Sequence, residues 1–169
     1  MNGASEAGTA GPAARMTQAE LMTEVDQGWR RFREAVRHVG RAKMDEPTGA
    51  GWSYHDLIAH IAGWHDLTAR RLRAYRTTGA FPGPGDGAAI GIPDFKDADE
   101  FNARLVSEHR LVGAEALVDE VDTTFRSLRA ELAKLTDEQI RADAARVVKV
   151  VAGNTYGHYE EHAKELGPV

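Results

Sequence analysis

The chain has 169 residues, of which 42% are hydrophobic and 28% charged, a composition typical of one globular domain large enough to bury a core. Its formal net charge of −5 argues against a general nucleic-acid binder. The absence of cysteine excludes disulfides and thiol catalysis by the protein, and it fits a cytoplasmic location. No run approaches the ~18 consecutive apolar residues of a membrane span, so we expect no membrane partner.

Residues 1–15 are mostly small and polar, which predicts a disordered leader before a single domain over residues 16–169. Thr17 and Glu20 have the spacing of a capping box at a helix start. Apolar residues then recur at steps of three and four, which predicts an amphipathic helix over residues 18–39. These apolar residues are Leu21, Val25, Trp29, Phe32, Val36 and Val39.

A second helix is predicted to begin after Ser53, with Asp56 near its amino end, and to run to about Thr77. His60 falls on its apolar stripe. His55 and His65 lie off that stripe and are expected at the surface. The same helix carries a cluster of arginines that we interpret as a solvated face: Arg70, Arg71, Arg73 and Arg76.

Residues 79–96 are rich in glycine and proline and predict a loop without regular structure, either a lid over a binding site or an ordinary connection. A third helical region is expected from Asp97 or Asp99, with a break near Gly113. A strong apolar stripe predicts a helix over residues 114–135, and a short helical turn should follow Thr136. The final helix is predicted from about Val147 to its end at Gly167–Pro168.

No useful alternating strand pattern and no phosphate-binding glycine motif is found in the sequence. Four long amphipathic helices with one long connection predict an all-α four-helix bundle. Such a bundle builds its sites from inward-facing side chains on neighbouring helices.

His158 and His162 are four residues apart and lie on one face of the final helix, where two imidazoles are able to hold one metal ion. His60 is the expected third ligand. Three neutral imidazoles with an open fourth position are typical of a catalytic site for zinc or a similar divalent ion. Alone, His60 is better explained as a satisfied core histidine, and the alternative for the other two is a solvated or capping role near the helix end.

The run Gly51 to Trp64, GWSYHDLIAHIAGW, resembles the second-helix signature of the DinB-like superfamily, and its details resemble the ClbS/DfsB branch. The segments FNAR at residues 101–104 and YGHYEEH at residues 156–162 are similar to that branch too. The resemblance covers roughly residues 17–166.

This resemblance implies an up-down-down-up bundle with a divalent ion bound at the positions of His60, His158 and His162. Metal-dependent relatives include transferases and isomerases that use the thiols mycothiol or bacillithiol. Some ClbS/DfsB members instead protect their hosts from reactive natural products and lack the histidine triad. This chain keeps the triad, which makes a metal-free mechanism less natural for it.

The first hypothesis is therefore an enzyme that binds zinc or nickel, with a low-molecular-weight thiol as a further candidate cofactor, and acts as a hydrolase or thiol transferase on a small electrophile. Glu161 and Tyr159 are candidates for catalysis, and Trp64 and Asn102 for pocket lining, with core packing and helix capping as the alternatives for the last two. The second hypothesis is a self-resistance or binding protein that sequesters or detoxifies a reactive natural product without metal, and the third is a module that binds another protein. The expected partners are a small-molecule substrate and a second copy in a homodimer, and no nucleic acid.

Overall fold

The computed structural model describes residues 16–48 and 51–166. Regular structure in these ranges is helical, without a β-strand, and one isolated β-bridge pairs Pro47 with Ser53. The predicted leader over residues 1–15 and the predicted stop at Gly167–Pro168 lie outside the described residues.

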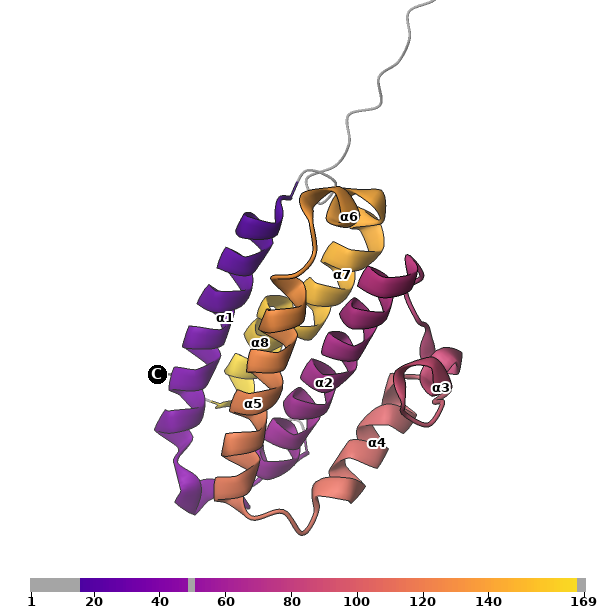
Figure 1. The fold of residues 1–169 in the computed structure, drawn as a ribbon. Helices are drawn as coiled ribbons and strands as arrows, with labels where there is room; N and C mark the ends of the chain where they lie inside the picture. Colours follow the sequence, from indigo (N-terminus) through magenta and orange to yellow (C-terminus); the bar gives the residue numbers. More distant parts are fainter. Residues whose placement is uncertain (1–15, 49–50, 167–169) are drawn as a thin grey trace, which may run out of the picture.

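The bundle consists of α1 (Gln18–Val39), α2 (Tyr54–Thr78), α5 (Ala114–Leu132), and a fourth rod made of α7 (Ala144–Asn154) followed by α8 (Tyr156–Leu166) (Figure 1). α1 and the fourth rod run one way, whereas α2 and α5 run the other way. This is the predicted up-down-down-up order, so the all-α bundle is confirmed. No helix in the described part of the chain is both long and apolar enough to cross a membrane.

The helix starts follow the capping signals in the sequence. The Thr17 hydroxyl accepts from the backbone N–H of Glu20, whose carboxylate accepts from the backbone N–H of Thr17. Ser53 and Asp56 form the same reciprocal pair at the start of α2. Because each box satisfies backbone donors that the first helical turn leaves free, both starts were predictable from local sequence.

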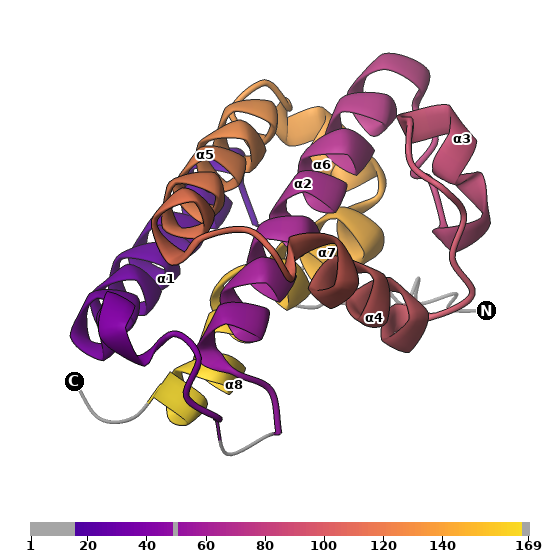
Figure 2. The same cartoon turned by 90° about the horizontal axis from the view of Figure 1, so that it is seen from below.

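The connection after α2 is more ordered than predicted. It contains a 3₁₀ turn over Pro84–Asp86 and the short helix α3 (Gly87–Ile90) before α4 (Ala98–His109). Ile90 and Phe95 are buried in a small core cluster with Leu67 of α2, and this burial holds the connection in place. Figure 2 shows α3 and α4 on the side of α2 that faces away from α1 and α5.

The fourth rod differs from the predicted continuous final helix, because it begins at Ala144 and is interrupted at Thr155. The Thr155 hydroxyl donates to the Val151 carbonyl at 2.6 Å, and its backbone N–H turns instead to Ala152. A side chain that competes for the helix's own carbonyls is a known cause of such breaks. α7 consequently packs on α2, whereas α8 packs mainly on α1.

The arginines of α2 are not the uniform solvated face that we predicted. Arg71 is buried, with 7% of its surface exposed. Arg73 and Arg76 reach the buried carboxylate of Glu131 on α5, with N–O distances of 3.0 and 3.7 Å. The environments of Arg73 and Arg76 depend on Glu131 of α5, which is far from them in sequence. The helical periodicity of α2 alone therefore does not predict them.

Gly28 sets the distance between α1 and α8. A Cβ atom at this position would lie 2.7 Å from Cβ and 2.8 Å from Cα of Tyr156. The Cα atom belongs to the backbone of α8 and has no rotamer by which to move away. At Gly153, on α7, an added Cβ would have no neighbouring atom within 4 Å, so this glycine serves as a matched control.

We expect Gly28→Ala to lower the free energy of unfolding by about 1–3 kcal/mol, because the added methyl group forces the two helices apart. Gly153→Ala should raise it by up to ~1 kcal/mol through helix propensity alone. Urea denaturation followed by circular dichroism measures both. Equal effects of the two substitutions would show that the α1–α8 contact tolerates a side chain.

Candidate metal centre

His60 of α2 meets His158 and His162 of α8, as predicted. One ring nitrogen from each histidine lies within 4.8 Å of the others. The Nε2 atoms of His60 and His158 are 2.7 Å apart, and the ring centroids of His158 and His162 are separated by 4.7 Å. His60 is buried and the other two are partly buried. The structure thus assembles three imidazoles from two helices at one point.

Asn102 orients the His60 ring. Its Oδ1 atom lies 2.9 Å from both Trp64 Nε1 and His60 Nδ1. Since the indole nitrogen only donates, the Asn102 atom must be the carbonyl oxygen, and His60 therefore carries its proton on Nδ1. This tautomer leaves the Nε2 lone pair facing the other two histidines, which is the arrangement usual for a metal-binding histidine. Trp64 and Asn102, predicted as pocket residues, both contact the triad.

Glu165 orients His162 and was missed by the sequence analysis. Its Oε1 atom lies 3.0 Å from His162 Nδ1, and its Oε2 atom is buried without a hydrogen bond in the described structure. The signal was available, because positions three residues apart in a helix are neighbours and a carboxylate is a frequent partner of a ligating histidine. His162 consequently presents its Nε2 atom to the centre.

His158 is less well satisfied than the other two rings. With the His60 proton on Nδ1, the short contact between the two Nε2 atoms requires His158 to donate. The Nδ1 atom of His158 is buried and has no hydrogen-bond partner in the described part of the chain. Two imidazole nitrogens brought together in this way, with a third beside them, match the donor set of a borderline divalent ion such as zinc.

Burial keeps His60 and His158 neutral. It lowers the pKa of His60 to about 4 and that of His158 to about 2, and the neighbouring imidazoles add to both shifts. A histidine binds metal only in its neutral form. At neutral pH these two rings are therefore already in the form that a metal ion requires.

Two tryptophans enclose the triad. Trp52 lies 4.8 Å from His60 and 6.5 Å from His162, measured between ring centroids. Trp64 lies 6.4 Å from His158 on another side. A cavity of about 440 Å³ is lined by Trp52, Asp99, Asn102, Ala103 and Val106, so it shares Trp52 and Asn102 with the surroundings of the triad but none of the histidines. Aromatic walls beside polar ligands are typical of sites for small organic molecules.

Of the two residues predicted as catalytic, Tyr159 lies in the core and Glu161 lies at the surface. Tyr159 is buried against Phe32, and its hydroxyl lies 2.6 Å from Nε2 of His65 rather than at the triad. Burial raises the pKa of Tyr159 well above its usual value, so the hydroxyl is a donor. Glu161 is exposed and forms no hydrogen bond or ion pair with the residues that the structure describes.

The surface positions predicted for His55 and His65 are wrong. His55 is buried, with Nε2 2.7 Å from the carbonyl oxygen of Val112, and it fastens the start of α2 to the connection before α5. His65 is fully buried between α2, α5 and α8. α2 is covered by other helices on several sides, so a single apolar stripe underestimates how much of it is buried.

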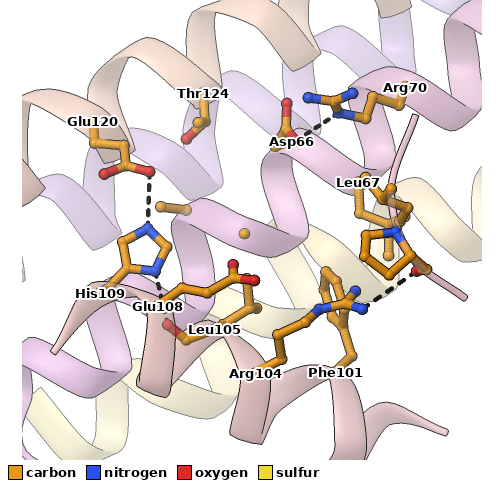
Figure 3. A pocket seen from close by; sticks show the side chains of 14 residues that line it. Asp66, Leu67, Arg70, Phe101, Arg104, Leu105, Glu108, His109, Glu120 and Thr124 are labelled. Carbon is orange, nitrogen blue, oxygen red and sulfur yellow. Dashed lines mark hydrogen bonds and ion pairs between the residues drawn. The ribbon is translucent and has the colours of Figure 1, made fainter. Parts of the chain in front are cut away.

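A second cavity, of about 320 Å³, lies between α2, α4 and α5 and contains no member of the triad (Figure 3). Two pairs of its charged groups are matched with each other. His109 Nε2 lies 2.9 Å from the Glu120 carboxylate, and Arg70 Nε lies 2.7 Å from that of Asp66. Arg104 instead contacts the Pro93 carbonyl and the rings of Phe95 and Phe101.

The chain belongs to the DinB superfamily, because the model of that family matches residues 24–165. No curated protein matches the chain. The fold is similar to that of the colibactin self-resistance protein ClbS in complex with double-stranded DNA, with a TM-score of 0.74, 13% identity and coverage of 93% of this chain and 95% of that one. It is also similar to an uncharacterised protein from Escherichia coli UTI89, with a TM-score of 0.71, 18% identity and coverage of 89% and 90%. These likenesses establish a shared fold, and they confirm the resemblance seen in the motifs.

The comparison corrects the expectation of no nucleic-acid partner. That expectation rested on the net charge of −5, yet ClbS, which shares this fold, is in complex with double-stranded DNA. Net charge sums over the whole surface, whereas binding depends on where the charges lie. An acidic balance is therefore not a ground for excluding nucleic acid.

We expect the metal-free protein to lose stability as the pH falls from about 6.5 towards 3. Burial lowers the pKa of His65 to about 3, so in this interval the unfolded chain binds a proton at His65 that the folded chain does not, and unfolding becomes more favourable. The expected loss is on the order of a few kcal/mol.

Urea midpoints measured at several pH values in the presence of a chelator test this expectation. Carboxylates titrate in the same interval, so the slope must be compared with that of His65→Gln, which removes the buried imidazole, and of His38→Gln, at an exposed position. A slope unchanged in His65→Gln would contradict the prediction.

Proposed function

We propose that this protein is a metal-dependent enzyme that acts on a small electrophilic molecule, as a hydrolase or a thiol transferase. The observation that carries the proposal is the convergence of His60, His158 and His162, whose ring nitrogens lie within 4.8 Å of one another. Membership of the DinB superfamily supports it, because the resemblance to that superfamily implies a divalent ion bound at these positions. Zinc or nickel fits three imidazole donors best.

The protein's contribution is to hold three imidazole rings in place. Asn102 and Glu165 fix the tautomers of His60 and His162, and burial keeps His60 and His158 uncharged. When bound there, a divalent ion supplies Lewis acidity and an open ligand position, which makes water or an external thiol a better nucleophile at neutral pH. Trp52 and Trp64 provide apolar surface that shields an electrophile from bulk water.

We assign the acid–base role to Glu161 and a positioning role to Tyr159. Glu161 follows His158 by three residues, which makes the two neighbours on the surface of α8, and its carboxylate is exposed. The Tyr159 hydroxyl is engaged by His65, so this side chain acts through the interior packing of α8. A residue held in this way fixes the rotation of the helix that carries both metal ligands.

Elemental analysis of purified protein tests the metal assignment. We expect wild-type protein loaded with zinc or nickel to retain one ion per chain after gel filtration, and His158→Ala to retain less than about a tenth of that, because the site then lacks one of its three ligands. His38→Ala, which removes an exposed imidazole, is the matched control. Full metal retention in His158→Ala would overturn the assignment.

The second candidate function is self-resistance without metal, in which the protein sequesters or detoxifies a reactive natural product. The fold likeness to the self-resistance protein ClbS favours this candidate. That complex also makes double-stranded DNA a candidate partner here. The two candidate functions differ in one respect, which is whether the histidine triad is needed.

Protection of duplex DNA from cross-linking by a small diepoxide separates them. If the metal-dependent function is correct, wild-type protein should reduce cross-linking, with or without an added low-molecular-weight thiol, and His158→Ala should lose at least about tenfold of that effect. His38→Ala should behave as wild type. Protection retained in His158→Ala and in the presence of a chelator would favour the metal-free function.

A further inference from the structure

Arg71, on α2, is a buried cation without a matched partner. Only 7% of its surface is exposed. Within the described residues its guanidinium forms no hydrogen bond and no ion pair, and its Nε atom is buried and unsatisfied. Arg73 and Arg76 on the same helix both reach a carboxylate. Arg71 is thus an exception among its neighbours.

The surroundings of Arg71 do little to compensate its charge. Burial lowers the pKa of the guanidinium, and the more distant Asp86 only partly opposes this effect. Phe95 lies beneath it, with 5.8 Å between Cζ and the ring centroid. A cation–π contact of this kind contributes less than the cost of burying a charge. An anion that binds beside Arg71 would therefore complete an interaction that the protein leaves open.

There is room for such an anion. Arg71 lines a cavity of about 570 Å³ between α2 and α7. The polar residues of this cavity include three cations and one carboxylate: Arg71, Arg146, Lys149, Asp143 and Asn154. The carboxylate, Asp143, lies 3.7 Å from Arg146, so it is turned to another cation. The cavity is positive in a protein whose net charge is −5.

The cavity adjoins the metal centre through Trp64, which lines it. The same indole lies 6.2 Å from the ring of His60 and 6.4 Å from that of His158. Asn154, on the other wall, donates from its side-chain amide to Thr68 of α2 and so fixes α7 against α2 at the cavity. Trp64 is therefore the side chain that this cavity and the triad share.

We propose that this cavity is a subsite for the oxyanion of a small molecule, a carboxylate, phosphate or sulfate group, and that Arg71 is its principal contact. A guanidinium binds such groups with two parallel hydrogen bonds. The recessed position of Arg71 favours a terminal group on a small molecule over the backbone of a polynucleotide. As a statement about substrate, the proposal rests on the proposed function, because it makes an anionic electrophile or thiol the class of molecule that the triad acts on.

Nuclear magnetic resonance of ¹⁵N-labelled protein tests the proposal directly. The Nε–H signal of Arg71, assigned through its own side chain, should shift saturably when inorganic phosphate or acetate is titrated at constant ionic strength. Arg71→Met should weaken phosphate binding at least about tenfold, because it keeps an apolar stem but loses the donors. Arg30→Met makes the same change in charge at an exposed position and should bind as wild type. The absence of a saturable shift in wild-type protein would overturn the proposal, even if Arg71→Met does not fold.

Two further titrations distinguish the Arg71 subsite from anion binding at the histidines and from nucleic-acid binding. In His158→Ala the phosphate-induced shift should persist, because the subsite does not include the triad. Loss of the shift there would mean that the anion binds at the histidines, and the Arg71 subsite would be rejected whatever the outcome of the metal analysis. A short DNA duplex should not reproduce the shift at phosphate concentrations where the free ion does. A stronger response to the duplex would replace the small-molecule subsite with a nucleic-acid contact.

Discussion

Three imidazole rings lie close together between α2 and α8, and the need to satisfy their nitrogens organises the structure around them. A buried polar atom without a hydrogen-bond partner destabilises the folded state, so buried imidazole nitrogens need partners from other side chains. α4 crosses α2 and delivers the Asn102 carbonyl to His60, while Glu165, one turn further along α8, serves His162. What is left is a 2.7 Å contact between two Nε2 atoms and an unsatisfied Nδ1 on His158. A cation would relieve the crowding of these nitrogens by drawing on their lone pairs.

α8 carries two polar networks on different faces. His158 and His162, one turn apart, face Trp52, Trp64 and His60. Tyr159 is rotated by about 100° on the helix and points into the core, where it meets His65 beneath Phe32. The break at Thr155 gives α8 its own direction against α1, separate from that of α7. The positions of His158 and His162 therefore depend on the Thr155 hydroxyl, at which the helix is interrupted, and on the Tyr159 hydroxyl, which bonds to His65.

Charge is distributed unevenly over this acidic protein. Glu131 pairs with two arginines and a lysine, and the cavity between α2, α4 and α5 contains the matched pairs Asp66–Arg70 and Glu120–His109. The cavity beside Trp64 contains the buried cation Arg71, which has no carboxylate within ion-pair distance in the described structure. Such local excess explains why the net charge is a poor guide to the ligands of this protein.

The sequence by itself determined the features that depend on neighbours within one helix. Two capping boxes placed the starts of α1 and α2, apolar periodicity identified the bundle, and the spacing of His158 and His162 located the site. The contact between Glu165 and His162 is of the same local kind and could have been predicted from the sequence, because the two residues are about one helical turn apart. Only the tertiary structure decided the burial of His55, His65 and Arg71, because that burial comes from helices far away in the chain. The role of Asn102 was decided there too, because its hydrogen bonds join α4 to His60 and Trp64 of α2 and leave no pattern in either helix alone.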